Sequence, residues 1–271
     1  MRYFGVIGSP IHHSLSPLIH NFLFSYLGIS AHYDKFDIPS PSLLASTLQS
    51  LSGANITLPY KEEVFGLCDE VRGFAQEVEA VNTVLCRNQK LCGFNTDGLG
   101  FWECIKNLEL KTALVLGAGG SARAIAMMLK KQGVDTMIYN RTPSKVDFFL
   151  SRGIGVLETL EVKEVDLLVH TTSVGLDGKS LPYQQEKLQS LVSKAKYVFD
   201  VIYPSQKGIV GIDQFRDFFL SRPKTAFLGL SSQGMDGLEM LLYQAFFAFE
   251  IFCDGQYCFE ELKALFYNSL K

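Results

Sequence analysis

The stretch Leu114-Val-Leu-Gly117-Ala-Gly-Gly-Ser-Ala122 decides the fold. It places the pattern G-x-G-x-x-A between an apolar strand and a helical segment, so that two glycines let the backbone turn tightly and approach a pyrophosphate. The helix N-terminus then offers free N–H groups to that anion. A glycine-rich turn that binds nothing is the alternative. The pattern predicts a dinucleotide-binding α/β domain whose cofactor contacts are Gly117, Ala118, Gly119, Gly120, Ser121 and Ala122.

The next predicted strand indicates which dinucleotide is bound. Enzymes that use NAD commonly end this strand in Asp or Glu, which binds the adenosine ribose hydroxyls and repels a 2′-phosphate. Here the strand ends in Tyr139-Asn140-Arg141-Thr142, and Lys145 follows closely. Asn140 removes the repelling carboxylate. Arg141 and Lys145 supply cations, and Thr142 supplies a hydroxyl donor. Arg141 as an ordinary solvated charge is the alternative, and the set favours NADP as the cofactor.

Apolar segments around this loop extend the α/β pattern. A helix is predicted at Ala122–Lys131, and strands are predicted at Thr112–Leu116, Thr136–Tyr139, Asp166–His170 and Tyr197–Val201. Continuously apolar strands are typical of a parallel sheet that helices cover on both faces. Residues 103–237 are therefore predicted to form a Rossmann-type domain.

The first hundred residues also alternate strands with helices. Ser16-Pro17 predicts a helix start, because a hydroxyl N-cap precedes proline in the first turn. Strands separated by helices predict parallel pairing, and residues 237–271 are helical in pattern. The strands of this part are predicted at Tyr3–Gly8, Ala54–Leu58, Val81–Cys86 and Leu91–Phe94. We expect two α/β domains, 1–102 plus 238–271 and 103–237, with the active site in the cleft between them.

Composition narrows the class of protein. The chain has 271 residues, of which 47% are hydrophobic and 20% charged, and a formal net charge of −3. These values are typical of a soluble globular protein and give no electrostatic reason to expect nucleic acid or an anionic membrane as partner. No apolar run reaches the roughly 18 residues that a membrane span needs. Tyr3–Gly8 predicts a strand where a secretion signal would be apolar throughout.

Cysteine and histidine positions bear on metal sites and on the compartment. Six cysteines occur without a C-x-x-C pair, so mostly buried free thiols in a reducing cytoplasm are expected, with a disulfide framework or a zinc site as alternatives. No metal is predicted, since no carboxylate or thiol stands at ligand spacing around His12, His13, His20 and His32. The oligomeric state stays open between monomer and homodimer.

Polar residues stand at strand ends and helix starts of the first domain, where open α/β sheets bind ligands. Ser14 and Ser16 lie around a helix N-terminus, which suits a carboxylate, although Ser16 as a simple N-cap is the alternative. Lys61 follows the strand that ends in Asn55-Ile-Thr57. It is either a surface lysine or a cleft lysine whose lost solvation suits proton transfer.

Two further polar groups follow in the chain. Asn82-Thr83 interrupts an apolar strand, and because buried amides must be hydrogen-bonded, a protein partner or a ligand is required there. Asp97 ends the stretch Asn95-Thr-Asp97 and is either a helix N-cap or a functional carboxylate.

Seven motifs in this order resemble the shikimate dehydrogenase family along almost the whole chain. In the first domain they are Gly8-Ser-Pro-Ile-His-His-Ser-Leu-Ser-Pro-Leu-Ile-His-Asn21, Gly53-Ala-Asn-Ile-Thr-Leu-Pro-Tyr-Lys61, Ala80-Val-Asn-Thr83 and Gly93-Phe-Asn-Thr-Asp-Gly-Leu-Gly100. The others are Gly117-Ala-Gly-Gly-Ser121, Asn140-Arg-Thr142 and Gly237-Leu-Glu-Met-Leu-Leu-Tyr-Gln-Ala245. Seven motifs in one order are far more specific than any one of them.

The resemblance implies an oxidoreductase that reversibly reduces 3-dehydroshikimate to shikimate with NADPH, on the route to chorismate and the aromatic amino acids. It implies that Lys61 and Asp97 form the catalytic pair and that the helix carrying Gln244 packs back on the first, substrate-binding domain. Substrate contacts are implied for Ser14 and Ser16, at the carboxylate, and for Asn55, Thr57, Asn82, Tyr203 and Gln244. Val201 and Gly237 would join the cofactor contacts.

Three positions depart from the pattern of that family. Glu79 stands where glycine is usual, His170 replaces a common asparagine, and Pro204 follows Tyr203 directly where one more residue is usual. The third departure alters the loop on which the Tyr203 contact depends. Three other functions stay open. One is a quinate/shikimate dehydrogenase of broader specificity, expected to prefer NAD, and another is a non-catalytic sensor, expected to have lost Lys61 or Asp97. The third is a fold-related enzyme of one-carbon folate metabolism, which would leave the paired serines unexplained.

Overall fold

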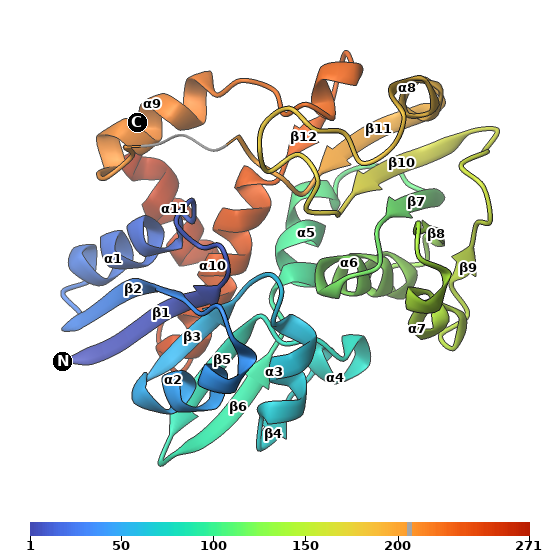
Figure 1. Cartoon of the computed structure of the whole chain (residues 1–271). Coiled ribbons are helices and arrows are strands. Elements are labelled where there is room, and N and C mark those ends of the chain that lie inside the picture. The colour runs from blue at the N-terminus through green and yellow to red at the C-terminus, as the bar shows by residue number, and fades with distance from the viewer. Residues whose placement is uncertain (205–207) are drawn as a thin grey trace. The chain divides into compact units, whose positions relative to one another are not determined.

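The computed structural model describes residues 1–204 and 208–271, which form two compact units (Figure 1). Of the described residues, the first unit holds 1–100, 208–220 and 241–271, and the second holds 101–204 and 221–240. Three helices contain a unit boundary: α5 (Asp97–Ile105), α9 (Ile212–Ser221) and α10 (Leu238–Phe252). Each unit has its own six-stranded sheet.

The sheet of the first unit is mixed. Its strand order is β2-β1-β3-β5-β6-β4, with β1 (Arg2–Gly8), β2 (Ala31–Asp37), β3 (Gly53–Ile56), β4 (Glu70–Val71), β5 (Thr83–Arg87) and β6 (Lys90–Phe94). β1 pairs parallel with β2 and β3, and β4 parallel with β6, whereas β5 is antiparallel to β3 and β6. The expectation of parallel pairing is therefore wrong for β5. Asn88 and Gln89, at φ 50° and 63°, form a two-residue turn of the kind that joins antiparallel strands.

Helices of the first unit cover this sheet. α1 (Ser16–Tyr26) buries Ile19, Leu23 and Phe24 on one face and ends before Gly28, whose φ of 66° suits glycine. The remaining helices are the short 3₁₀ turn η1 (Pro41–Leu43), α2 (Leu44–Ser50), α3 (Lys61–Leu67), α4 (Phe74–Val78), α9 (Ile212–Ser221) and α11 (Phe259–Ser269).

The second unit has a fully parallel sheet of order β12-β11-β10-β7-β8-β9. If β7 to β12 are numbered 1 to 6 and the sheet is followed from β9 to β12, the order is 3-2-1-4-5-6. This is the order of dinucleotide-binding folds, so the predicted Rossmann-type fold is confirmed. Its strands are β7 (Thr112–Leu116), β8 (Asp135–Tyr139), β9 (Gly155–Val156), β10 (Val165–His170), β11 (Ala195–Asp200) and β12 (Met235–Asp236). Its helices are α6 (Gly120–Lys131), α7 (Asp147–Leu150) and α8 (Gln185–Val192), with 3₁₀ turns η2 (Pro143–Lys145) and η3 (Leu228–Leu230).

Strand β7 lies at the centre of this unit with both faces covered. Ala113 and Val115 pack into a core with residues of α6, whereas Leu114 and Leu116 pack into a second core with residues of α8. All four side chains are completely buried. A continuous apolar run is what this position requires, because alternate residues of a strand point to opposite faces.

The division into units differs from the expected domain boundaries at residues 208–220. The sequence assigned them to the second domain, but they belong to the first unit by their contacts. In α9 the ring of Phe215 packs edge-on against Phe266 of α11, with ring centroids 5.7 Å apart. This apolar contact between segments far apart in the chain has no local sequence signal.

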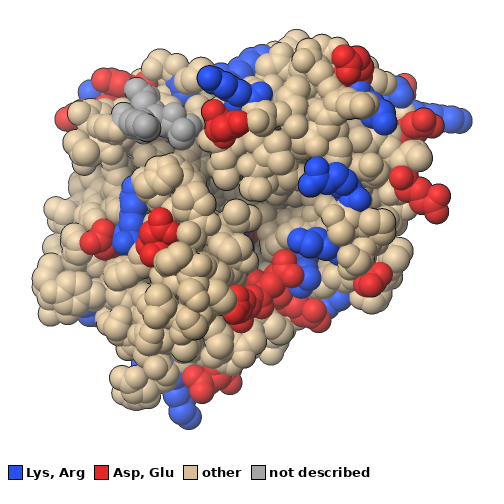
Figure 2. Space-filling model, viewed as in Figure 1, with Lys and Arg blue, Asp and Glu red and all other residues tan. Residues whose placement is uncertain are grey.

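Surface properties agree with the composition. On the face shown in Figure 2, acidic and basic side chains lie among one another over the described residues. In residues 1–204 and 208–271, no helix is long and apolar enough to cross a membrane. All six cysteines are unpaired, but only Cys253 is buried, so the expectation of mostly buried thiols is wrong.

Candidate active site

Lys61 and Asp97 form an ion pair in the first unit. Lys61 begins α3 and Asp97 begins α5, and Lys61 Nζ lies 2.5 Å from Asp97 Oδ2. The two side chains are only 14% and 7% exposed, so the alternative of a surface lysine is wrong. The carbonyl of Lys61 accepts a hydrogen bond from Val81 N at 2.8 Å, which fixes the start of α3 beside the segment that carries Asn82.

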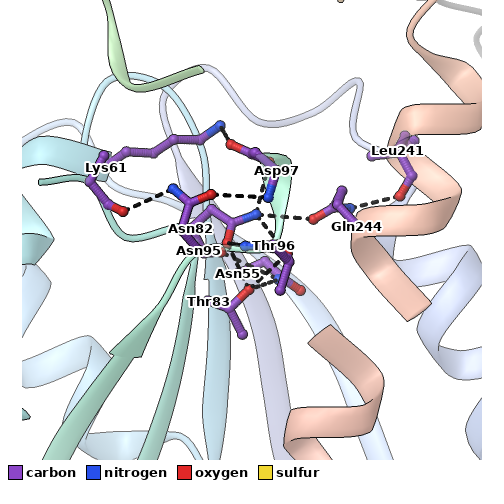
Figure 3. A network of polar contacts seen from close by, with 10 residues as sticks. Asn55, Lys61, Asn82, Thr83, Asn95, Thr96, Asp97, Leu241 and Gln244 are labelled. Atoms are coloured by element: carbon purple, nitrogen blue, oxygen red, sulfur yellow. Dashed lines mark hydrogen bonds and ion pairs between the residues drawn. The ribbon is translucent and has the colours of Figure 1, made fainter. Parts of the chain in front are cut away.

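Asn82 holds the other oxygen of the Asp97 carboxylate (Figure 3). Its Oδ1 accepts from the backbone N of Thr96 at 2.8 Å, so its Nδ2 must point the other way. Nδ2 donates to Asp97 Oδ1 at 2.8 Å. Asn95 supports the same turn, because its Nδ2 donates to the carbonyl of Ala80 and its Oδ1 accepts from Asp97 N. The Asn82 amide, which the sequence required to have a partner, has protein partners at both its oxygen and its nitrogen.

Asn55 is tied to the same network from β3. Its Nδ2 donates to Thr83 Oγ1 at 3.1 Å and to the carbonyl of Asn82 at 3.3 Å. Its Oδ1 accepts from the hydroxyl of Tyr33 at 2.7 Å. Thr83 in turn donates to Asn82 Oδ1 at 3.0 Å. Tyr33, Asn55, Thr83 and Asn82 are all buried.

Ser14 and Ser16 lie at the start of α1. The N-cap residue of this helix is Leu15, so the interpretation of Ser16 as its N-cap is wrong. The N–H of Ser16 donates to Ser14 Oγ at 3.3 Å, and the two hydroxyl oxygens are also 3.3 Å apart. Both serines are buried. Thr57 lies half-buried beside the end of β1, where a Cβ on Gly8 would clash with its methyl group.

Gln244 joins the network from α10, as the resemblance implied. Its Oε1 accepts from Asn82 Nδ2 at 3.3 Å, and its Nε2 donates to the carbonyl of Leu241 at 2.7 Å (Figure 3). A close backbone approach makes this possible, since a Cβ on Gly100 would lie 2.6 Å from the backbone N of Gln244. Glycine at position 100 is therefore required by packing.

His20 lies behind the serines and is completely buried. Its ring stacks on Tyr33 with centroids 4.4 Å apart and contacts Phe24, Phe249 and Phe252. Within the described chain, neither ring nitrogen has a hydrogen-bond partner. Burial lowers the pKa of His20 to about 3, and the nearby Asn55 side chain acts weakly in the opposite direction. His20 is therefore neutral in the folded protein at physiological pH.

The glycine-rich loop of the second unit has the geometry that its sequence predicted. Gly117 has a φ of 121°, and a Cβ there would come within 2.5 Å of Thr171 Oγ1, so only glycine fits. A Cβ on Gly119 would meet no atom within 4 Å, so packing does not require glycine there. Gly120 begins α6 and Ala122 is fully buried against the sheet.

The residues expected at the adenosine 2′-phosphate follow β8. Arg141, Thr142 and Lys145 are exposed, and Asn140 Nδ2 donates to the carbonyl of Thr142 at 2.9 Å. Val201 and Gly237 are neighbours, because a Cβ on Gly237 would clash with the Val201 carbonyl. Tyr203 also belongs to the second unit, whereas the network around Lys61 lies in the first.

Two departures from the family pattern have clear structural settings. Glu79 has a left-handed backbone with a φ of 51° at the end of α4, where glycine is unstrained. His170 ends β10 and is buried, with Nδ1 2.8 Å from Asp200 Oδ1 and Nε2 2.7 Å from the hydroxyl of Thr172. Imidazole thus fills the place of an amide with two polar partners.

Sequence reasoning missed Tyr33 and Thr96 as parts of the network, and His20 as the ring that stacks on Tyr33. Tyr33 lies on β2, an edge strand that is largely polar and exposed and therefore has no apolar pattern. Thr96 lies within the motif Gly93–Gly100, which suggested no role for it. In the residues described, no cluster of three or more His, Cys, Asp or Glu is placed to hold a metal ion.

The chain resembles known proteins over its whole length. A family model for the shikimate dehydrogenase substrate binding domain matches residues 6–84. A shikimate dehydrogenase (NADP(+)) of Helicobacter hepaticus is 42% identical over 263 residues, which cover 95% of this chain and 93% of that protein. The enzyme of the same name from Aquifex aeolicus is 36% identical over 274 residues, which cover 96% of this chain and 95% of that protein.

Solved structures agree with these relatives. Shikimate 5-dehydrogenase from Thermus thermophilus, in complex with NADP(H) and shikimate, matches with a TM-score of 0.79 and 30% identity. The match covers 99% of this chain and all of that one.

Proposed function

Because the chain belongs to the shikimate dehydrogenase family, we propose that it reversibly reduces 3-dehydroshikimate to shikimate with NADPH, with Lys61 and Asp97 at the reacting centre. The observation that carries this proposal is the largely buried Lys61–Asp97 pair, whose Nζ and Oδ2 atoms are 2.5 Å apart. A buried ion pair contributes little to stability, because desolvation offsets the attraction, so its burial favours a chemical role.

The chemistry needs a proton where charge develops. When bound, NADPH supplies the hydride that reduces the ring carbonyl. Negative charge then develops on the carbonyl oxygen, and Lys61 Nζ donates a proton to that oxygen; in the oxidation direction Lys61 accepts it back. Asp97 Oδ2 holds the ammonium group of Lys61 in place, and Asn82 Nδ2 donates to the other carboxylate oxygen, Asp97 Oδ1.

Substrate recognition follows from the groups around this pair. We assign the substrate carboxylate to Ser14 and Ser16, whose hydroxyls lie 3.3 Å apart at the start of α1. The ring hydroxyls would be met by Asn55, Thr57, Asn82 and Gln244. Tyr203 stays a proposed carboxylate contact.

The second unit fits a dinucleotide. Gly117 and Gly119 would allow close approach of the pyrophosphate, and the N-terminus of α6 would hold it through backbone N–H groups. Arg141, Thr142 and Lys145 would hold the 2′-phosphate that distinguishes NADP from NAD. Six unpaired cysteines suit a reducing compartment, and we propose a cytoplasmic location for the enzyme.

Turnover tests the proposal directly. NADPH oxidation is followed with 3-dehydroshikimate, and the reverse reaction with shikimate; dehydroquinate, quinate and NADH serve as controls. We expect turnover with 3-dehydroshikimate and NADPH and at most slow turnover with the controls. No turnover of 3-dehydroshikimate would refute the function, and equal rates with quinate would support the broader enzyme.

The roles of the pair are tested by substitution. Lys61→Ala is expected to lower kcat by at least about 100-fold, the lower end for an acid–base residue. Asp97→Asn is expected to lower kcat/KM, because the amide cannot hold the ammonium group as a carboxylate does. Lys90→Ala, at an exposed lysine of the same unit, is the matched control and should leave kcat unchanged. Near wild-type turnover by Lys61→Ala would remove Lys61 from the mechanism.

A further inference from the structure

Four hydrogen bonds in the first unit form one continuous chain that runs in a single direction. The hydroxyl of Tyr33 donates to Asn55 Oδ1 at 2.7 Å, and Asn55 Nδ2 donates to Thr83 Oγ1 at 3.1 Å. Thr83 donates to Asn82 Oδ1 at 3.0 Å, and Asn82 Nδ2 donates to Asp97 Oδ1 at 2.8 Å. The chain therefore begins at Tyr33 on β2 and ends on the carboxylate that holds Lys61.

The direction is set by neighbouring backbone groups. The Asn82 carbonyl accepts from Asn55 at 3.3 Å, so the NH₂ group of Asn55 must be on that side and its oxygen must face Tyr33. The N–H of Thr96 donates to Asn82 Oδ1 at 2.8 Å, which turns the NH₂ group of Asn82 toward Asp97. Thr83 Oγ1 accepts a hydrogen bond from Asn55, so the hydroxyl proton of Thr83 is available to donate to Asn82.

Tyr33 is suited to begin such a chain. It is 1% exposed and its ring is clamped by stacking on His20, so its hydroxyl has a fixed position. Burial raises the pKa of Tyr33 well above its ordinary value, against the opposing effects of Asn55 and Ser16, so the hydroxyl keeps its proton and remains a donor. The influence of Ser16 also places the start of the chain beside the serines assigned to the substrate carboxylate.

We propose that Tyr33 is a positioning residue of the reacting centre: through Asn55, Thr83 and Asn82, its hydroxyl orients the Asp97 carboxylate that holds Lys61. Hydrogen bonds in a chain polarise one another, so each donor strengthens the next in a buried setting. Without the Tyr33 hydroxyl, Asn55 Oδ1 loses its donor, and the hydrogen bonds that follow in the chain are weakened. The effect on turnover rests on the proposed function.

Two substitutions break the chain at different points. Tyr33→Phe removes its first donor, and Thr83→Val removes its middle hydroxyl with little change in volume. Thr83→Ser keeps the hydroxyl and is the conservative rescue. Tyr26→Phe, at an exposed tyrosine of α1, is the matched control.

Steady-state kinetics with 3-dehydroshikimate and NADPH give the main result. We expect kcat to fall about fivefold to tenfold in Tyr33→Phe and in Thr83→Val, the effect that one hydrogen bond supports, with KM for 3-dehydroshikimate little changed in Thr83→Val. Thr83→Ser should remain within about twofold of wild type. Because both substitutions break one chain, the double variant should be no slower than either single one. Independent defects would instead multiply to at least about 25-fold, and that result would overturn the proposal.

A second readout does not require turnover. With selectively ¹⁵N-labelled asparagine, the side-chain NH₂ signals of Asn82 are assigned by their loss in Asn82→Ser. One proton of this NH₂ group is hydrogen-bonded to Asp97 Oδ1. We expect its ¹H resonance to shift upfield in Tyr33→Phe and Thr83→Val but not in Tyr26→Phe. Unchanged Asn82 signals in both Tyr33→Phe and Thr83→Val would refute the proposed role of Tyr33. If the wild-type protein were inactive toward 3-dehydroshikimate, only the proposed function would be refuted.

Discussion

Lowering the pH from 7 to 5 is expected to cost the folded protein about 2 kcal/mol through His20 alone. His20 is completely buried among aromatic rings, and burial lowers its pKa to about 3 from an ordinary value of 6.5. Between these values the unfolded chain binds a proton at this position and the native protein does not. Stability from His20 is therefore complete above pH 6.5 and is lost as the pH falls toward 3.

The magnitude follows from the size of the shift. Each pH unit inside this window changes the free energy of unfolding by about 1.4 kcal/mol for one proton. The fall from 6.5 to 5 covers about 1.5 units, which gives about 2 kcal/mol. The pKa of His13 is also lowered by burial, so it contributes in the same direction and must be separated from His20.

Urea denaturation at pH 7, 6 and 5 measures this effect. The difference in pH dependence between wild type and His20→Leu isolates His20, because all other titrating groups are shared. We expect the variant to lose about 2 kcal/mol less than wild type over this range. His32→Gln, at an exposed histidine, is the matched control and should follow wild type. If His20→Leu keeps the full pH dependence of wild type, the reasoning is wrong; His20→Phe gives the same test should the leucine variant fold poorly.

Two further predictions concern single positions. Glu79→Gly should raise the free energy of unfolding by about 1 kcal/mol in urea denaturation, because glycine removes the cost of a left-handed backbone at φ 51°. Glu77→Gly, inside α4, should lower it by about as much, and a loss of stability in both would contradict the strain argument. Arg141→Asp should lower kcat/KM for NADPH by about 100-fold and change that for NADH less than about threefold, since the carboxylate repels a 2′-phosphate. Lys163→Asp is the exposed control in the same unit, and equal losses with both cofactors would remove Arg141 from the phosphate site.

Local patterns predicted the second unit well. β7 is observed at the predicted residues, Thr112–Leu116, because a strand buried on both faces must be apolar throughout. Gly117 was identified for its tight turn, and its φ of 121° confirms the reason. In the first unit the strands Val81–Cys86 and Leu91–Phe94 were predicted, but their antiparallel pairing was not.

By itself, the sequence determined the apolar strands, the glycine-rich turn and the residue types at the site, since these depend on backbone conformation and burial within short segments. Only the tertiary structure decided that Ser16 is not an N-cap and that Lys61 lies largely buried beside Asp97. It also decided that hydrogen bonds connect Tyr33 to Asp97. Hydrogen bonds between side chains depend on distances of about 3 Å between segments far apart in the chain, and no local pattern encodes such distances. Tyr33 lies on a polar edge strand, so only the paired sheet brings its hydroxyl to Asn55.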